Sequence, residues 1–143
     1  MAGLPRYAAG RAGTLLTVTA LAIAAGGCAR GVDDSDRSQV RSTAQVFLRL
    51  CAEQRGRDVV DLLNRSAGAQ FTRAGGVLPG CAAILRVGRG LAPGELHGAR
   101  VTAVQVVGPG ARARIALSSG TTATLDAERS DNGWYLTNDR FGR

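Results

Sequence analysis

The chain has 143 residues, a formal net charge of +7 and only 4% aromatic residues. All 18 basic residues are arginine, and they are scattered along the chain rather than grouped. Because so few aromatic side chains cannot build a stacking surface for single strands, we expect no nucleic-acid partner. One histidine and three cysteines, without a Cys-x-x-Cys pair, are too few ligands for a zinc site, and we expect neither a metal nor another cofactor.

The first 27 residues have the order of a secretory signal peptide. Arg6 and Arg11 precede an apolar run at residues 14–25, and small residues follow it. This run is shorter than the roughly 20 residues that a membrane-spanning helix needs. We therefore predict that residues 1–27 are an export signal that is removed, not a transmembrane anchor.

Residues 24–28, Ala-Ala-Gly-Gly-Cys, resemble the lipobox of bacterial lipoproteins. In that family small residues precede a cysteine that is acylated, typically with palmitate, and becomes the new N-terminus. Ala25 departs from the pattern, because the family most often has Leu there. The resemblance implies that lipid on Cys28 anchors the chain to the outer face of the cell membrane. The alternative is an ordinary signal peptidase that cuts at Ala22-Ile23-Ala24.

The cysteine count is consistent with lipidation. If Cys28 carries lipid, Cys51 and Cys81 remain as a pair that an oxidising compartment would join as a disulfide. Such a bridge would join the end of the first helix to the start of a later one. The alternative is that both are buried free cysteines, which behave as small apolar side chains.

The helical part of the chain is predicted to follow a short linker. Residues 28–37 are small and polar and are expected to form a flexible tether, which leaves residues 38–143 as one domain. Apolar residues at helical spacing predict a first helix from near Arg37 to Gly56, with Asp36 and Gln39 as its capping box. The further helical predictions are residues 58–64, one turn at 69–73, and a helix from Pro79 or Gly80 to Gly88 or Gly90.

From residue 99 the apolar pattern changes to a period of two, which is typical of strands. Turns rich in glycine separate the apolar runs, so we expect an antiparallel meander. The predicted strands are residues 100–107, 111–118, 122–129 and 134–138.

The odd-numbered residues of the two middle strands are apolar, so odd residues must pair with odd. A loop of residues 119–121 achieves this pairing. The predicted partners are Ile115 with Leu125, Arg114 with Asp126, and Arg112 with Glu128. The even face is then expected to face solvent, and the arginines would neutralise any carboxylate site there.

Helices followed by a four-stranded meander define an α+β fold. In this order the chain resembles the nuclear transport factor 2-like, or cystatin-like, α+β cone. The likeness rests on the opening helix at residues 42–49, the short helix at 56–63 and the closing turn and strand at 130–136. It is most similar to small actinobacterial lipoproteins with this fold and a helix-to-helix cysteine pair.

Enzymes of this family place an acid, a tyrosine or a histidine inside the cone. The inward face of the two middle strands carries only apolar residues, so we expect no catalytic residue. The expected function is a non-catalytic envelope lipoprotein, a binding or accessory module. Its cone would hold a small apolar ligand, or its sheet would dock an envelope protein or a second copy. The alternative is an isomerase- or cyclase-like enzyme for a small apolar substrate that uses His97 with Glu95 or Tyr135. Residues 93–98, which include His97 and Glu95, are predicted to form a loop.

Overall fold

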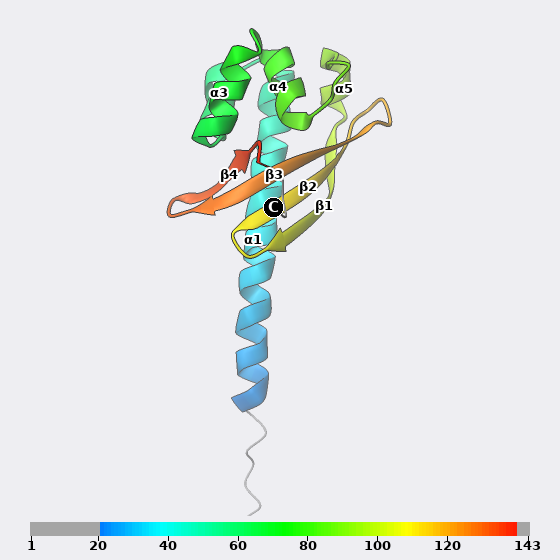
Figure 1. Cartoon of the computed structure of the whole chain (residues 1–143). Helices are drawn as coiled ribbons and strands as arrows, with labels where there is room; N and C mark the ends of the chain where they lie inside the picture. Colours follow the sequence, from blue (N-terminus) through cyan, green and yellow to red (C-terminus); the bar gives the residue numbers. More distant parts are fainter. Residues whose placement is uncertain (1–20, 140–143) are drawn as a thin grey trace, which may run out of the picture.

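The computed structural model describes the backbone of residues 21–139 and the side chains from residue 34 to residue 139. Within this part, helices precede a four-stranded antiparallel sheet, so the predicted α+β order is confirmed (Figure 1). The helices are α1 (Leu21–Ala52), α2 (Gly56–Val60), α3 (Arg65–Arg73), α4 (Val77–Leu85) and α5 (Pro93–His97). The strands are β1 (Arg100–Val107), β2 (Gly110–Ala116), β3 (Thr122–Ser130) and β4 (Gly133–Thr137).

Helix α1 is longer than the sequence predicted. It begins at Leu21 and includes residues 28–37, so the structure has a helix where a flexible tether was expected. No proline interrupts the segment, and Arg37 pairs with Asp34 one turn earlier, at 3.1 Å. The predicted capping box at Asp36 and Gln39 does not form, because both residues lie inside the helix.

The sheet has the order β1-β2-β3-β4, so each strand pairs with its neighbour in the sequence. This is the predicted meander, and the strand ends differ from the predicted ones by no more than two residues. Strand β1 carries one irregularity between Val101 and Ala103. After that bulge the even-numbered residues of β1, Val104 and Val106, lie on the same face as Ala111 and Ala113 of β2.

The main core lies between α1 and one face of the sheet. Val40, Ala44, Phe47 and Cys51 follow each other at helical spacing and are all fully buried. Odd-numbered residues of β2 and β3, together with Leu117 just after β2, pack in the same core as this stripe. The buried ones are Ala111, Ala113, Ile115, Leu117, Ala123, Leu125 and Ala127. Apolar side chains therefore fill the space between the helix and the sheet.

The predicted register of the β2–β3 hairpin is wrong by two residues. Ala113 pairs with Leu125, and Arg112 with Asp126, so Arg114 does not lie opposite Asp126. The loop consists of residues 118–120 and is closed by the hydrogen bond from the Leu117 amide to the Thr121 carbonyl, 2.9 Å. Gly120 takes the last loop position with φ of 87°, a left-handed conformation that favours glycine in three-residue hairpin loops. A shift of two preserves the apolar face, so the hydrophobic pattern alone does not exclude it.

The smaller helices also differ from prediction. The single turn expected at residues 69–73 is the complete helix α3, capped by Asn64, whose side chain accepts a hydrogen bond from the Ala67 amide. Helix α4 begins at Val77, before Pro79, and ends at Leu85 with Arg86 in the left-handed conformation. Helix α5 lies where the sequence predicted a loop, and Pro93 occupies its first turn.

Candidate functional site

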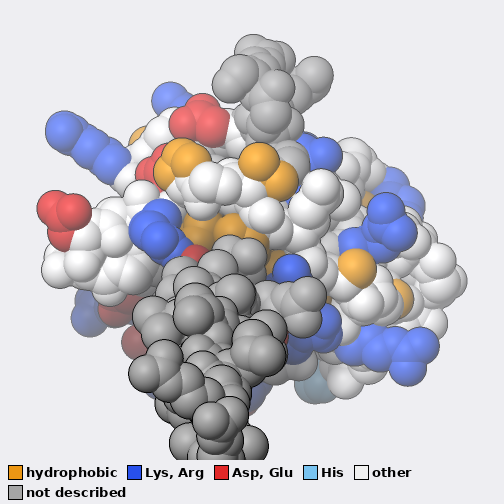
Figure 2. All heavy atoms as spheres, turned by 90° about the horizontal axis from the view of Figure 1, so that it is seen from below, with side chains coloured by type: hydrophobic (Ala, Val, Ile, Leu, Met, Phe, Trp, Pro, Cys, Tyr) orange, Lys and Arg blue, Asp and Glu red, His pale blue; other side chains and the backbone are white. Residues whose placement is uncertain are grey.

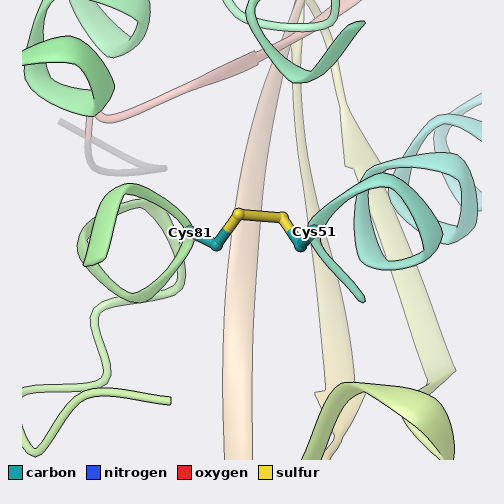
Figure 3. The surroundings of a disulfide bond; sticks show 2 residues. All are labelled: Cys51 and Cys81. Carbon is teal, nitrogen blue, oxygen red and sulfur yellow. A yellow bond between two sulfur atoms is a disulfide. The ribbon is translucent and has the colours of Figure 1, made fainter. Parts of the chain in front are cut away.

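Cys51 and Cys81 lie at disulfide distance in the structure, as the sequence predicted (Figure 3). Their Cα atoms are 6.2 Å apart, within the range of bridged pairs. Cys51 lies in the last turn of α1 and Cys81 in the middle of α4, and neither is exposed. The pair thus joins the long helix to the helical layer beyond the end of the sheet.

Cys28, the predicted lipidation site, lies in the N-terminal half of α1, but its side chain is outside the described part. The predicted signal peptide falls mostly on residues 1–20, which are also outside it. In Figure 1 this half of α1 projects beyond the sheet, away from the other helices. A group attached near Cys28 would therefore lie away from the folded domain.

A polar contact holds α1 where it meets the edge of the sheet. The Trp134 ring nitrogen donates a hydrogen bond to Asp36 at 3.3 Å, and Arg129 forms an ion pair with the same carboxylate. The Arg129 guanidinium also lies over the Trp134 ring, 5.2 Å from its centre. Asp36 therefore fixes the direction in which the projecting helix leaves the domain.

The face of the sheet opposite α1 contains a buried carboxylate. Asp126, whose side chain is 1% exposed, accepts hydrogen bonds from Arg112 at 2.7 and 3.1 Å and from Arg86 at 3.2 Å. The hydrogen bonds to Asp126 raise the pKa of Arg112 further above its ordinary value. Arg86 also donates to the Asn138 carbonyl at 3.1 Å. Asp126 is neutralised by Arg112 and Arg86, not by the expected Arg114, and it is buried rather than solvated.

Glu128 on the same face is also engaged. The Asn64 amide nitrogen donates to Glu128 and to Thr137, both at 2.8 Å. The backbone around Asn64 lies beside β4, where its amide donates to the Leu136 carbonyl at 2.8 Å. These bonds give Glu128 a structural role. The sequence reasoning missed Asn64, although an Asn placed before a helix is a usual capping signal.

A groove of about 390 Å³ lies between the second half of α1 and α5. Its apolar lining comes from Leu48, Ala52, Leu96 and Ala99. Its polar lining comes from Gln45, Arg49, Glu53, His97 and Arg100. The sequence did not predict this groove, because α5 was expected to be a loop.

The three residues of the alternative enzymatic hypothesis have different surroundings in the structure. His97 is exposed and lines the α1–α5 groove, whereas neither Glu95 nor Tyr135 lines it. Glu95 instead accepts a hydrogen bond from Arg89 at 2.7 Å. Tyr135 lies on β4 opposite Glu128, on the face that carries Asp126.

Two features are absent from the described part of the chain, a membrane-spanning helix and a cluster of metal ligands. Among residues 21–139, no helix is both long and apolar enough to cross a membrane. No group of three or more His, Cys, Asp or Glu side chains in the described part is placed to hold a metal ion.

Figure 2 views the end from which α1 projects. Arginines are spread around the margin of this end, with small groups of hydrophobic side chains between them.

No protein-family model, curated protein or solved structure matches the chain.

Proposed function

We propose that this chain is an exported, lipid-anchored and non-catalytic protein, a small binding or accessory module on the outer side of the cytoplasmic membrane. The observation that carries the proposal is the position of Cys51 and Cys81 at disulfide distance. A structural disulfide suits an oxidising compartment, which agrees with an export signal at residues 1–27. Of the three cysteines, Cys28 then remains for the lipid that its small-residue context suggests.

The long helix supports this arrangement. Cys28 lies about two turns before Asp36, the residue that holds α1 against Arg129 and Trp134. A lipid at Cys28 would therefore be joined to the domain by a helical stalk instead of a loose tether. Such a stalk would hold one end of the sheet towards the membrane surface.

The family proposal is a nuclear transport factor 2-like, or cystatin-like, domain. It is supported by a long helix that packs across one face of a four-stranded antiparallel meander. A non-catalytic role is supported by the inward face of β2 and β3, where the buried odd-numbered residues from Ala111 to Ala127 are all apolar. A reaction in that space would have no general acid or base.

The anchor is tested by fractionation of cells that express wild type, Cys28→Ala or the control Ser35→Ala. We expect wild type and Ser35→Ala in the membrane fraction and Cys28→Ala in the soluble or secreted fraction. Mass spectrometry of the wild-type N-terminal peptide should show an acylated Cys28. An unmodified N-terminus at any other residue would refute the lipid anchor.

A further inference from the structure

Two arginines in the lining of the α1–α5 groove form no ion pair within the described residues 34–139. Arg49 on α1 and Arg100 at the start of β1 are both exposed, and neither makes an ion pair or hydrogen bond with another side chain between residues 34 and 139. His97 lies in the same lining. Arg49, His97 and Arg100 come from three different elements and line one groove, together with the amide of Gln45 on α1.

Two acidic side chains lie nearby, and neither forms an ion pair with Arg49 or Arg100. Glu53 lines the groove, and its carboxylate lies 3.6 Å from the guanidinium of Arg55. Arg55 itself is not part of the lining. Glu95 on α5 pairs with Arg89 at 2.7 Å and is mostly buried. The two arginines of the groove therefore remain available to an anion from outside.

Beneath these charges the groove is apolar. Leu48 and Leu96 are buried, and Ala52 and Ala99 are half-buried. The small alanine side chains leave the space open, and its volume of about 390 Å³ falls in the range of small-molecule sites. An apolar lining with a few charged groups at the rim is the usual composition of such sites.

We propose that this groove binds a small amphipathic anion, with its acidic head between Arg49 and Arg100 and a short apolar body against Ala52 and Ala99. Guanidinium groups suit carboxylate and phosphate heads because they donate paired hydrogen bonds. The head belongs either to a free small acid or to an anionic lipid. This inference adds a ligand class to the proposed binding module, and its test does not depend on the lipid at Cys28.

The test is calorimetric titration of the full chain carrying Cys28→Ala, which lacks the proposed lipid and needs no nanodisc, with buffer alone as the blank. The probes are 4-phenylbutyrate, its neutral analogue 4-phenylbutanol, and acetate, which lacks the apolar body. We expect saturable binding of phenylbutyrate and at least about tenfold weaker binding of the other two probes. Equal affinity for phenylbutanol, or no saturable binding of phenylbutyrate or of the lipid probe described below, would overturn the proposal.

Variants locate the site. Arg49→Gln and Arg100→Gln should each weaken phenylbutyrate binding about tenfold, because each removes a charged donor. The matched control is Arg65→Gln, which makes the same charge change on α3 outside the groove and should leave affinity unchanged. Ala52→Leu, which fills the groove without a charge change, should also weaken binding. A loss of affinity in Arg65→Gln equal to that in Arg49→Gln would assign binding to net charge and refute the site.

A soluble short-chain lipid, dihexanoyl phosphatidylglycerol, distinguishes the two possible ligands, a free small acid and an anionic lipid. Tighter binding than phenylbutyrate, with the same dependence on Arg49 and Arg100, supports an anionic lipid as the ligand. Weaker binding supports a free acid. Binding of this lipid that does not depend on either arginine would count against the groove.

Discussion

The two faces of the sheet are covered in different ways. The face towards α1 is closed by apolar side chains, among them Phe47, Ile115 and Leu125, which are fully buried. The opposite face is held by polar bonds, in which Asp126 and Glu128 are contacted by Arg86, Arg112 and Asn64. Successive residues of β3 therefore pack in different ways: Leu125 lies among apolar side chains, and Asp126 is held by hydrogen bonds.

This difference shows what each kind of contact requires. Burial of apolar area is non-directional, so any well-fitting apolar partner on α1 satisfies the inner face. A buried carboxylate instead needs donors at defined positions, because an unpaired buried charge is costly. Asp126 obtains one donor from the neighbouring strand and another from Arg86, 40 positions away in the sequence.

The largest expected loss of stability comes from a substitution on the apolar face. Phe47→Ala should lower the free energy of unfolding by about 3 to 5 kcal/mol, because it leaves a cavity between α1 and the sheet. Urea unfolding followed by the fluorescence of Trp134 measures it. The control Val107→Ala, at a side chain that is 56% exposed, should change stability by less than about 0.5 kcal/mol. Equal losses in the two variants would contradict the proposed core.

The second effect concerns the link between α1 and α4. Replacing both Cys51 and Cys81 by Ala should lower the free energy of unfolding by about 3 to 4 kcal/mol, the chain-entropy value for a loop of this length. Reduction of wild type should reproduce the loss, and the double variant should not respond to reductant. If reductant leaves the unfolding midpoint of wild type unchanged, the two cysteines do not form the bridge.

The third prediction tests the polar face and the corrected register together. A double-mutant cycle between Arg112→Ala and Asp126→Ala should give a coupling of about 1 kcal/mol, reduced by the partial exposure of Arg112. The matched cycle between Arg114→Ala and Asp126→Ala should give about zero, since Arg114 lies opposite Thr124. A larger coupling for Arg114 would restore the register that the sequence suggested.

The last prediction concerns the corner beside β4. Asn64→Ala should cost about 1 to 2 kcal/mol, because it removes the cap of α3 and the hydrogen bonds to Glu128 and Thr137. Asn132→Ala is the control, since the Asn132 side chain is exposed in the β3–β4 turn. Thermal unfolding compares the two. A cost for Asn132 as large as that for Asn64 would refute the role of Asn64 in joining the helical layer to the sheet.

The sequence predicted one part of the candidate site, the cysteine pair, but not the groove. The pairing of Cys51 with Cys81 was predicted from the cysteine count and their places on apolar faces. The α1–α5 groove was not predicted, because residues 93–97 are too short and rich in loop formers to show a helical period. Its lining joins Arg49 to Arg100, which are far apart in the chain.

The sequence by itself determined the order of helices before strands, the four strands and the residues of the two middle strands that face α1. These features depend on local periodicity and turns, which a short stretch of chain already contains. Only the tertiary structure decided the register of β2 with β3 and the partners of Asp126 and Glu128. A shift of two residues preserves the apolar face, so the choice between registers fell to the conformation of Gly120 and to directional bonds. Such bonds form between distant residues, which only the folded chain brings together.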